Sequence, residues 1–282
     1  MNICIAGATG AVGFEAVKLA SAQGHSILTL SRSPKRAGKL NGLAHQIATL
    51  DAASAVPNLE GMEVVVSCLG GSVRVNDPEK RSYLDVDLKA NQNLLRAAVK
   101  AGVKKFIYVS VHLEPAYRRT RYIQAHEEFV AQLQTSAIAA TVIRPTGIYS
   151  ALADFVQMAK NGFLMVVGNG NARSNPIHEA DVAQCCIDHL TREGADISIG
   201  GPEILTRGAI ADLAFEAIQK PSRPMHVNAS IMRVAGKAAG VFNPRLGDLF
   251  EFVTEAVTHD CVAPLYGTRR LADYFRTVAA TS

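Results

Sequence analysis

Three glycines near the start of the chain have the spacing of a phosphate-binding turn. They fall in the run Gly7-Ala8-Thr9-Gly10-Ala11-Val12-Gly13, between an apolar stretch and a helical pattern. The first glycine permits a tight turn, the second lets backbone approach a diphosphate, and the third lets the helix pack against a sheet. A helix N-terminus offers free N–H groups and a partial positive charge to phosphates. The run therefore predicts a dinucleotide site; the alternative is a purely structural glycine turn.

A basic segment after the second apolar stretch bears on which dinucleotide is bound. An NAD-specific site places an Asp or Glu there, on the ribose 2′-hydroxyl. This chain instead has Arg32, Lys35 and Arg36 and no acid. Guanidinium geometry suits a 2′-phosphate. We therefore expect NADP (NADPH) as the cofactor, with NAD less favoured; the alternative is a solvated basic loop.

Short apolar runs alternate with helical patterns through the first half of the chain. Strands are predicted at Asn2–Ala6, Ser26–Ser31, Gln46–Leu50, Glu63–Cys68, Lys105–Ser110 and Ala140–Arg144. Helices are predicted at Gly13–Gln23, Leu84–Ala101, Thr120–Gln134 and Ala151–Asn161. Runs of Val and Ile without strict alternation indicate strands buried on both faces. The fold class is therefore α/β, a Rossmann doubly wound parallel sheet with helices on both sides.

After Pro145 the pattern loosens, which indicates a second, smaller unit. We expect a Rossmann domain over residues 1–147 and a substrate lobe over most of 148–282, with 174–200 returning to the core sheet. A helix opens near Asp181 and a late strand covers Ile197–Gly200. Further helices are predicted at Thr206–Lys220 and Ala229–Ala239. The lobe should cover the carboxyl edge of the sheet, where such folds bind ligands.

Composition narrows the class of protein. The 282 residues are 48% apolar with a net charge of +4, too mild a charge to indicate nucleic acid. The number of cysteines, five, is odd, and their spacing matches no metal-binding motif. We therefore expect reduced thiols and no metal site. No signal peptide and no apolar run of about 18 residues is visible. We expect a cytoplasmic protein with a small-molecule substrate and no nucleic-acid or membrane partner.

Four stretches beyond the glycine run resemble the atypical short-chain dehydrogenases/reductases, the branch with NmrA-like and nucleoside-diphosphate-sugar-epimerase-like members. These stretches are Asp87–Leu95, Ala101–Ser110, Ile143–Thr146 and Pro176–Ala183. With the glycine run they span about two thirds of the chain in the family's order. Apart from the resemblance, Asp85 and Asp87 fit the acidic start of a helix and need no acid–base role.

The resemblance implies a path for the cofactor along the sheet edge. The pyrophosphate would meet the residues from Thr9 to Val12 within the glycine turn, and Asp51 would approach the adenine. The segment Ser67-Cys68-Leu69-Gly70 would pass beside the adenine ribose. The nicotinamide would be flanked by Pro145, Thr146 and Ile148.

The catalytic set departs from the family pattern at one position. Active members use a Ser at the end of the fifth strand and a Tyr-x-x-x-Lys on the next helix. Ser110 and Tyr122 fit, but His126 stands where the Lys is expected. The ordinary pKa of a Tyr is ~10, and a neighbouring Lys lowers it because its positive charge stabilises the phenolate. A neutral His carries no such charge and lowers the Tyr pKa less. His126 could still bind a ribose hydroxyl or donate a proton; the alternative is a degenerate site with ordinary helix residues.

Three functions remain open from the sequence. The first is an NADP(H)-dependent oxidoreductase acting on a small carbonyl or alcohol substrate, with Tyr122, Ser110 or His126 handling the proton. The second is a non-catalytic NADP(H)-sensing regulatory or interaction protein of the NmrA-like kind, which the missing Lys favours. The third is an epimerase-like enzyme on a nucleotide-linked sugar, which the broken Tyr/Lys pair disfavours.

Overall fold

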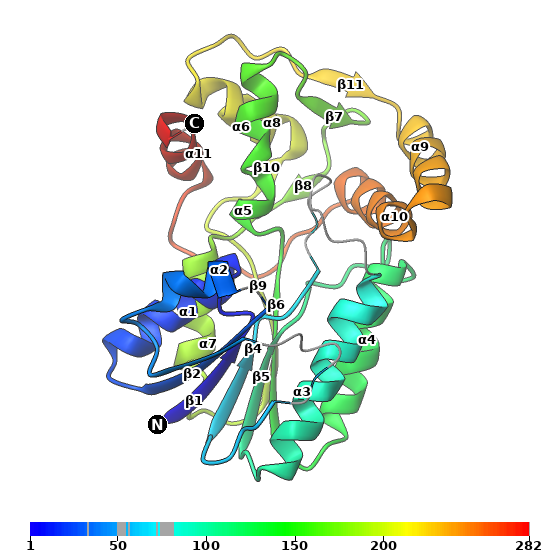
Figure 1. Cartoon of the computed structure of the whole chain (residues 1–282). Helices are drawn as coiled ribbons and strands as arrows, with labels where there is room; N and C mark the ends of the chain where they lie inside the picture. The colour runs from blue at the N-terminus through cyan, green and yellow to red at the C-terminus, as the bar shows by residue number, and fades with distance from the viewer. Residues whose placement is uncertain (33, 50–54, 56, 72, 74–81, 282) are drawn as a thin grey trace.

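Seven parallel strands form the central sheet of the computed structural model, which describes residues 1–32, 34–49, 55, 57–71, 73 and 82–281. The strands are β1 Asn2–Ala6, β2 Ser26–Ser31, β3 Gln46–Thr49, β4 Val64–Ser67, β5 Lys105–Val109, β6 Ala139–Pro145 and β9 Ala195–Ile199. Their order is β3-β2-β1-β4-β5-β6-β9. The doubly wound α/β class is therefore confirmed. The strand order reverses between β1 and β4, and their carboxyl ends face the upper lobe (Figure 1).

Helices cover both faces of the sheet because alternate strand residues point to opposite sides. The helices are α1 Ala11–Ala22, α7 Glu179–Asp188, α3 Lys89–Lys100 and α4 Arg121–Gln134, with the π-helical turn η2 Leu84–Leu88 leading into α3. Ile3 and Ile5 pack with α1 and α7 in one core. Cys4 and Ala6 pack with α3 and α4 in the other. The short helices α2 Pro34–Ala37 and η1 Gly38–Leu40 follow β2.

The upper lobe has a core of its own. Its helices are α5 Tyr149–Leu152, α6 Asp154–Lys160, α8 Arg207–Ala217, α9 Ala229–Phe242, α10 Pro244–Thr258 and α11 Leu271–Thr281. Its short strands are β7 Met165–Val167, β8 Arg173–Ser174, β10 Leu205–Thr206 and β11 Met225–Val227. Tyr149, Phe215 and Phe275 are central to the apolar cluster of α5, α6, α8 and α11. The helices α9 and α10 form a pair at one side of the lobe (Figure 1).

The second half differs in detail from the expectations. The helix predicted over Ala151–Asn161 is two short helices, α5 and α6. The helix predicted to reach Lys220 ends at Ala217, and Gln219 then has a φ of +56°. The helices α10 and α11 and the four short strands were not predicted. Leu249 of α10 packs in the core beside α3 and α4, whereas Phe275 of α11 packs in the lobe core. No helix in the described residues has both the length and the apolar character to cross a bilayer.

Candidate functional site

The glycine turn after β1 forms a cradle that side chains would fill. Gly7 has a φ of +75°, and a Cβ there would lie 2.5 Å from the Cys68 carbonyl oxygen. A Cβ on Gly13 would lie 2.3 Å from the Gly7 carbonyl oxygen. Only glycine fits either position without moving backbone. The turn can therefore bring its amides close to a ligand.

The first turn of α1 leaves donors available at this cradle. Gly10 is the N-cap residue and carries no side chain to cap the helix. The first N–H groups of a helix have no partner within it. Gly10 and Ala11 are exposed and Thr9 is half-buried, whereas Val12 and Gly13 are buried. The Gly10 amide itself donates to the Gly7 carbonyl at 2.9 Å, so the donors left for a pyrophosphate are those of the first helical residues from Ala11 onward, and they fit the cofactor.

The predicted 2′-phosphate residues lie beside this turn. Gly7 N donates to the Leu30 carbonyl at 3.2 Å, which holds the turn against the end of β2. Arg32 comes two residues after Leu30 and is exposed. Lys35 and Arg36 follow on α2 and are also exposed. Arg32 thus follows the strand end that holds the turn, with Lys35 and Arg36 exposed on the next helix, while Asp51 lies outside the described residues.

The segment after β4 borders the other side of the turn. Cys68 N donates to the Ala6 carbonyl at 2.9 Å. Ser67 is fully buried, and its hydroxyl donates to Asn91 Oδ1 at 2.5 Å. Leu69 and Cys68 are half-buried and Gly70 is exposed. The Ser67 hydroxyl is therefore engaged within the fold, and Gly70 presents open backbone at the sheet edge.

Asp87 fixes the continuation of this segment. The Gly71 amide donates to both Asp87 carboxylate oxygens at 3.0 Å. The Asn91 side chain donates to the Asp87 carbonyl at 2.6 Å. Asp87 is fully buried, and besides lying at the start of the predicted helix its carboxylate holds the Gly71 backbone. The signal available in the sequence is the i,i+4 pair of Asp87 and Asn91 on one helix face.

The three predicted catalytic residues occupy different environments. Ser110 is 4% exposed, and its hydroxyl has no hydrogen-bond partner among the described residues. The Tyr122 ring lies edge-on to the rings of Tyr83 and His126, each at a centroid distance of 4.8 Å. Burial raises the pKa of Tyr122 well above its usual value, and the Asp87 carboxylate adds to this effect. Tyr122 is therefore a protonated phenol over the whole physiological range.

His126 is engaged inside the fold. Its Nδ1 lies 2.6 Å from the Tyr108 hydroxyl. Its Nε2 lies 3.2 Å from Asp87 Oδ1, outside a hydrogen-bonding orientation. The side chain is 4% exposed. His126 thus contacts Tyr108 of β5 and lies close to Asp87, the residue that holds Gly71.

The residues predicted to flank a nicotinamide follow β6. Pro145 is the last residue of that strand, and its carbonyl accepts from His112 N at 2.9 Å. The Thr146 hydroxyl donates to the Asn175 carbonyl at 2.5 Å and is buried. Ile148 forms a parallel bridge with Ile177. All three lie at the carboxyl end of β6, the edge that also carries the glycine turn.

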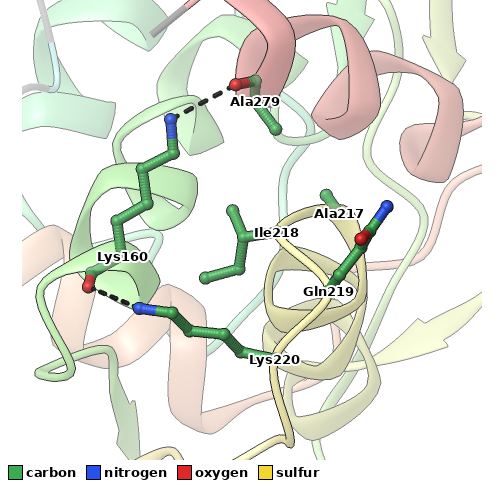
Figure 2. A pocket seen from close by; sticks show the side chains of 6 residues that line it. All are labelled: Lys160, Ala217, Ile218, Gln219, Lys220 and Ala279. Carbon is green, nitrogen blue, oxygen red and sulfur yellow. Dashed lines mark hydrogen bonds between the residues drawn. The ribbon is translucent and has the colours of Figure 1, made fainter.

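A hollow in the lobe is separate from this edge. Figure 2 shows it between α6, α8 and α11, lined by Lys160, Ala217, Ile218, Gln219, Lys220 and Ala279. Lys160 Nζ donates to the Ala279 carbonyl, and Lys220 Nζ donates to the Lys160 carbonyl, each at 3.2 Å. Both ammonium groups therefore satisfy carbonyls near helix C-termini. In the described residues no group of three His, Cys, Asp or Glu could hold a metal ion.

The fold and this edge define a dinucleotide-binding Rossmann protein of the atypical short-chain dehydrogenase/reductase type. A family model described as NAD(P)H-binding matches residues 7–193. The chain therefore belongs to the NAD(P)H-binding family. This family establishes NAD(P)H as the class of cofactor and confirms the resemblance drawn from the sequence motifs.

Two curated relatives and two solved structures illustrate the range of the family. Divinyl chlorophyllide a 8-vinyl-reductase of Arabidopsis thaliana is 26% identical over 89% of this chain and 66% of its own length. Photosystem II assembly factor Ycf39 of Synechocystis is 29% identical over 47% of this chain and 41% of its own. The chain thus spans less than two thirds of either relative.

The solved structures share the fold over nearly the whole chain. An NADPH-dependent quinone oxidoreductase from Escherichia coli, complexed with NADPH, has a TM-score of 0.72 at 18% identity, over 99% of both chains. A nucleoside-diphosphate-sugar epimerase from Staphylococcus aureus has a TM-score of 0.71 at 18% identity, over 98% of this chain and 100% of that one. Proteins with different chemistry share this fold, so the site must decide the function.

Proposed function

We propose that this protein is an NADP(H)-dependent reductase of a small carbonyl compound. The observation that carries the proposal is the arrangement at one sheet edge: the glycine cradle beside Arg32, and the buried Ser110 hydroxyl at the end of β5. The lobe formed by most of 148–282 would select the substrate. The A. thaliana relative is named as a reductase and the E. coli structure as a quinone oxidoreductase, which supports redox chemistry.

Cofactor selection follows from charge at the end of β2. The exposed Arg32 guanidinium can form a bidentate contact with a 2′-phosphate, and Lys35 and Arg36 add positive charge. The amides at the start of α1 would hold the pyrophosphate. When bound, NADPH supplies the hydride; the residues of the chain have to bind it and deliver a proton.

Tyr122 would serve as the proton donor in the reductive direction. Because its pKa is raised, the phenol keeps its proton and is present in the form that can donate to a developing alkoxide, as a weaker acid than an exposed tyrosine. It is a poor base for the reverse direction, because no Lys lowers its pKa. The free hydroxyl of Ser110 would hold the substrate oxygen beside it.

Catalysis is tested by following NADPH absorbance with a panel of aldehydes, ketones, enones and quinones. We expect Tyr122→Phe to lower kcat about 100-fold or more, while NADPH affinity stays within twofold of native. Ser110→Ala should raise KM and lower kcat. Tyr266→Phe, which removes a phenol hydroxyl bonded to Asp188 of α7, is the matched control and should keep native turnover. Native turnover by Tyr122→Phe would remove this residue from the mechanism.

Cofactor preference is tested by titrating NADPH and NADH separately. Arg32→Ala should weaken NADPH binding about tenfold to 150-fold, since a charge-assisted contact contributes about 1.5–3 kcal/mol. NADH affinity should change less than twofold. Lys39→Ala removes an exposed cation from the neighbouring helix η1 and serves as the control. Equal or tighter binding of NADH by the native chain would exclude the proposed selectivity.

One observation favours a second function, a non-catalytic NADP(H) sensor. His126 occupies the position of the family Lys and is held by Tyr108 and Asp87. The Synechocystis relative is named as an assembly factor. The sensor function predicts NADPH binding without turnover of any substrate in the panel, and a partner protein whose affinity changes when NADPH is added.

A further inference from the structure

The helix α9 exposes an apolar face to solvent. Ile231, Val234, Val241 and Phe242 are 62%, 67%, 79% and 91% exposed. With the exposed Ala235 and Ala238 they lie within an arc of about 120° at 100° per residue. We call these six residues the α9 outer face. A soluble helix normally turns such a face inward, so this face needs a partner.

The opposite side of α9 is already packed. A Cβ on Gly236 would lie 2.5 Å from the Phe250 side chain of α10, and a Cβ on Gly240 would lie 3.1 Å from Gly247. These glycines let the two helices approach closely. Rotating α9 about its axis to bury the outer face would break this contact with α10. A partner for the outer face must therefore come from outside the helix pair.

The charged residues of α9 itself are both basic, Arg233 and Lys237. The sequence has no Asp or Glu between Glu216 and Asp248. Lys237 is exposed on one border of the outer face. Arg233 on the same border pairs with Glu255 of α10 at 2.9 Å, so its charge is balanced. Exposed apolar residues bordered by unbalanced lysine are typical of a helix that lies on an anionic lipid surface.

We propose that the α9 outer face inserts into the interfacial region of an anionic lipid bilayer. A second copy in an antiparallel twofold contact fits less well, because that arrangement would bring the Lys237 border of each copy together. At 14 residues α9 is too short to cross a bilayer, which takes about 20. An interfacial helix needs no spanning segment, so the absence of a long apolar run in the sequence is compatible with this contact.

The proposal is tested by co-sedimentation with vesicles of phosphatidylcholine alone and of phosphatidylcholine with one quarter phosphatidylglycerol. We expect binding to the anionic vesicles, weakened by salt, and at least fivefold less binding to the neutral ones. The double variant Val234→Gln/Val241→Gln should lose about tenfold or more, and Lys237→Gln about fivefold.

Matched controls come from the exposed end of α3. Val99→Gln and Lys100→Gln make the same changes at exposed positions and should bind vesicles as native does. Circular dichroism and NADPH titration show that each variant is folded. Binding that fails with anionic vesicles, that is equal for both vesicle types, or that survives the double variant would overturn the proposal. So would a dimer without lipid that the double variant dissociates.

Discussion

Substitution of Gly13 by Ala tests the cradle directly. The new Cβ would lie 2.3 Å from the Gly7 carbonyl oxygen, 2.8 Å from its carbon and 3.0 Å from Ala8 Cα, all of them backbone atoms. The first distance is about 1 Å short of ordinary contact. No side chain can rotate to relieve it, so the start of α1 or the turn must move by about that amount.

A shift of that size has a calculable effect on cofactor binding. Amide hydrogen bonds span about 2.7–3.2 Å, so about 1 Å of displacement removes at least one contact to the pyrophosphate. A hydrogen bond to a charged group contributes about 1.5–3 kcal/mol, which corresponds to about tenfold to 150-fold in Kd. Overpacking should also lower the free energy of unfolding by about 1–3 kcal/mol.

Calorimetric titration with NADPH and urea unfolding measure the two effects. Gly208→Ala is the control, because a Cβ at this helix position in the lobe has its nearest atom at 3.6 Å. It should leave both quantities close to native. If folded Gly13→Ala binds NADPH within twofold of native, the α1 amides do not hold the pyrophosphate and the cradle argument is wrong.

Three further predictions concern the interior. Asp87→Ala should weaken NADPH binding about fivefold or more in the same titration, because it leaves the Gly71 amide unpaired and the segment beside the cofactor unfixed. Arg144→Met should lower the free energy of unfolding by about 2 kcal/mol in urea titrations. The substitution leaves Glu127 and Asp196, which each lie 2.6 Å from the guanidinium and are partly exposed, without their cation. Burial raises the pKa of Tyr108 well above its usual value, and Asp87 adds to this. The folded state should therefore lose stability as the pH rises above ~10, where the unfolded phenol ionises, by up to about 1.4 kcal/mol per pH unit. Tyr108→Phe should reduce that slope in alkaline unfolding curves.

Local chain properties made the sheet predictable. The predicted strands matched because β-branched runs buried on both faces carry a strong signal and glycines end the intervening helices. Gly24 and Gly102 both have positive φ values, at +74° and +70°. The lobe helices α10 and α11 went unpredicted, because which apolar residues face a core depends on neighbours from distant parts of the chain.

The sequence by itself determined the glycine turn and the basic loop after β2. Both depend on residues within a few positions of each other, and their geometry follows from steric freedom and charge. Only the tertiary structure decided what surrounds Tyr122 and His126. Asp87 and Tyr108 reach His126 from 39 and 18 residues away, because parallel crossovers bring η2, β5 and α4 to one place. Likewise, only packing of α9 on α10 decided which of its apolar residues remain exposed, because the close contacts at Gly236 and Gly240 set the side of α9 that is buried.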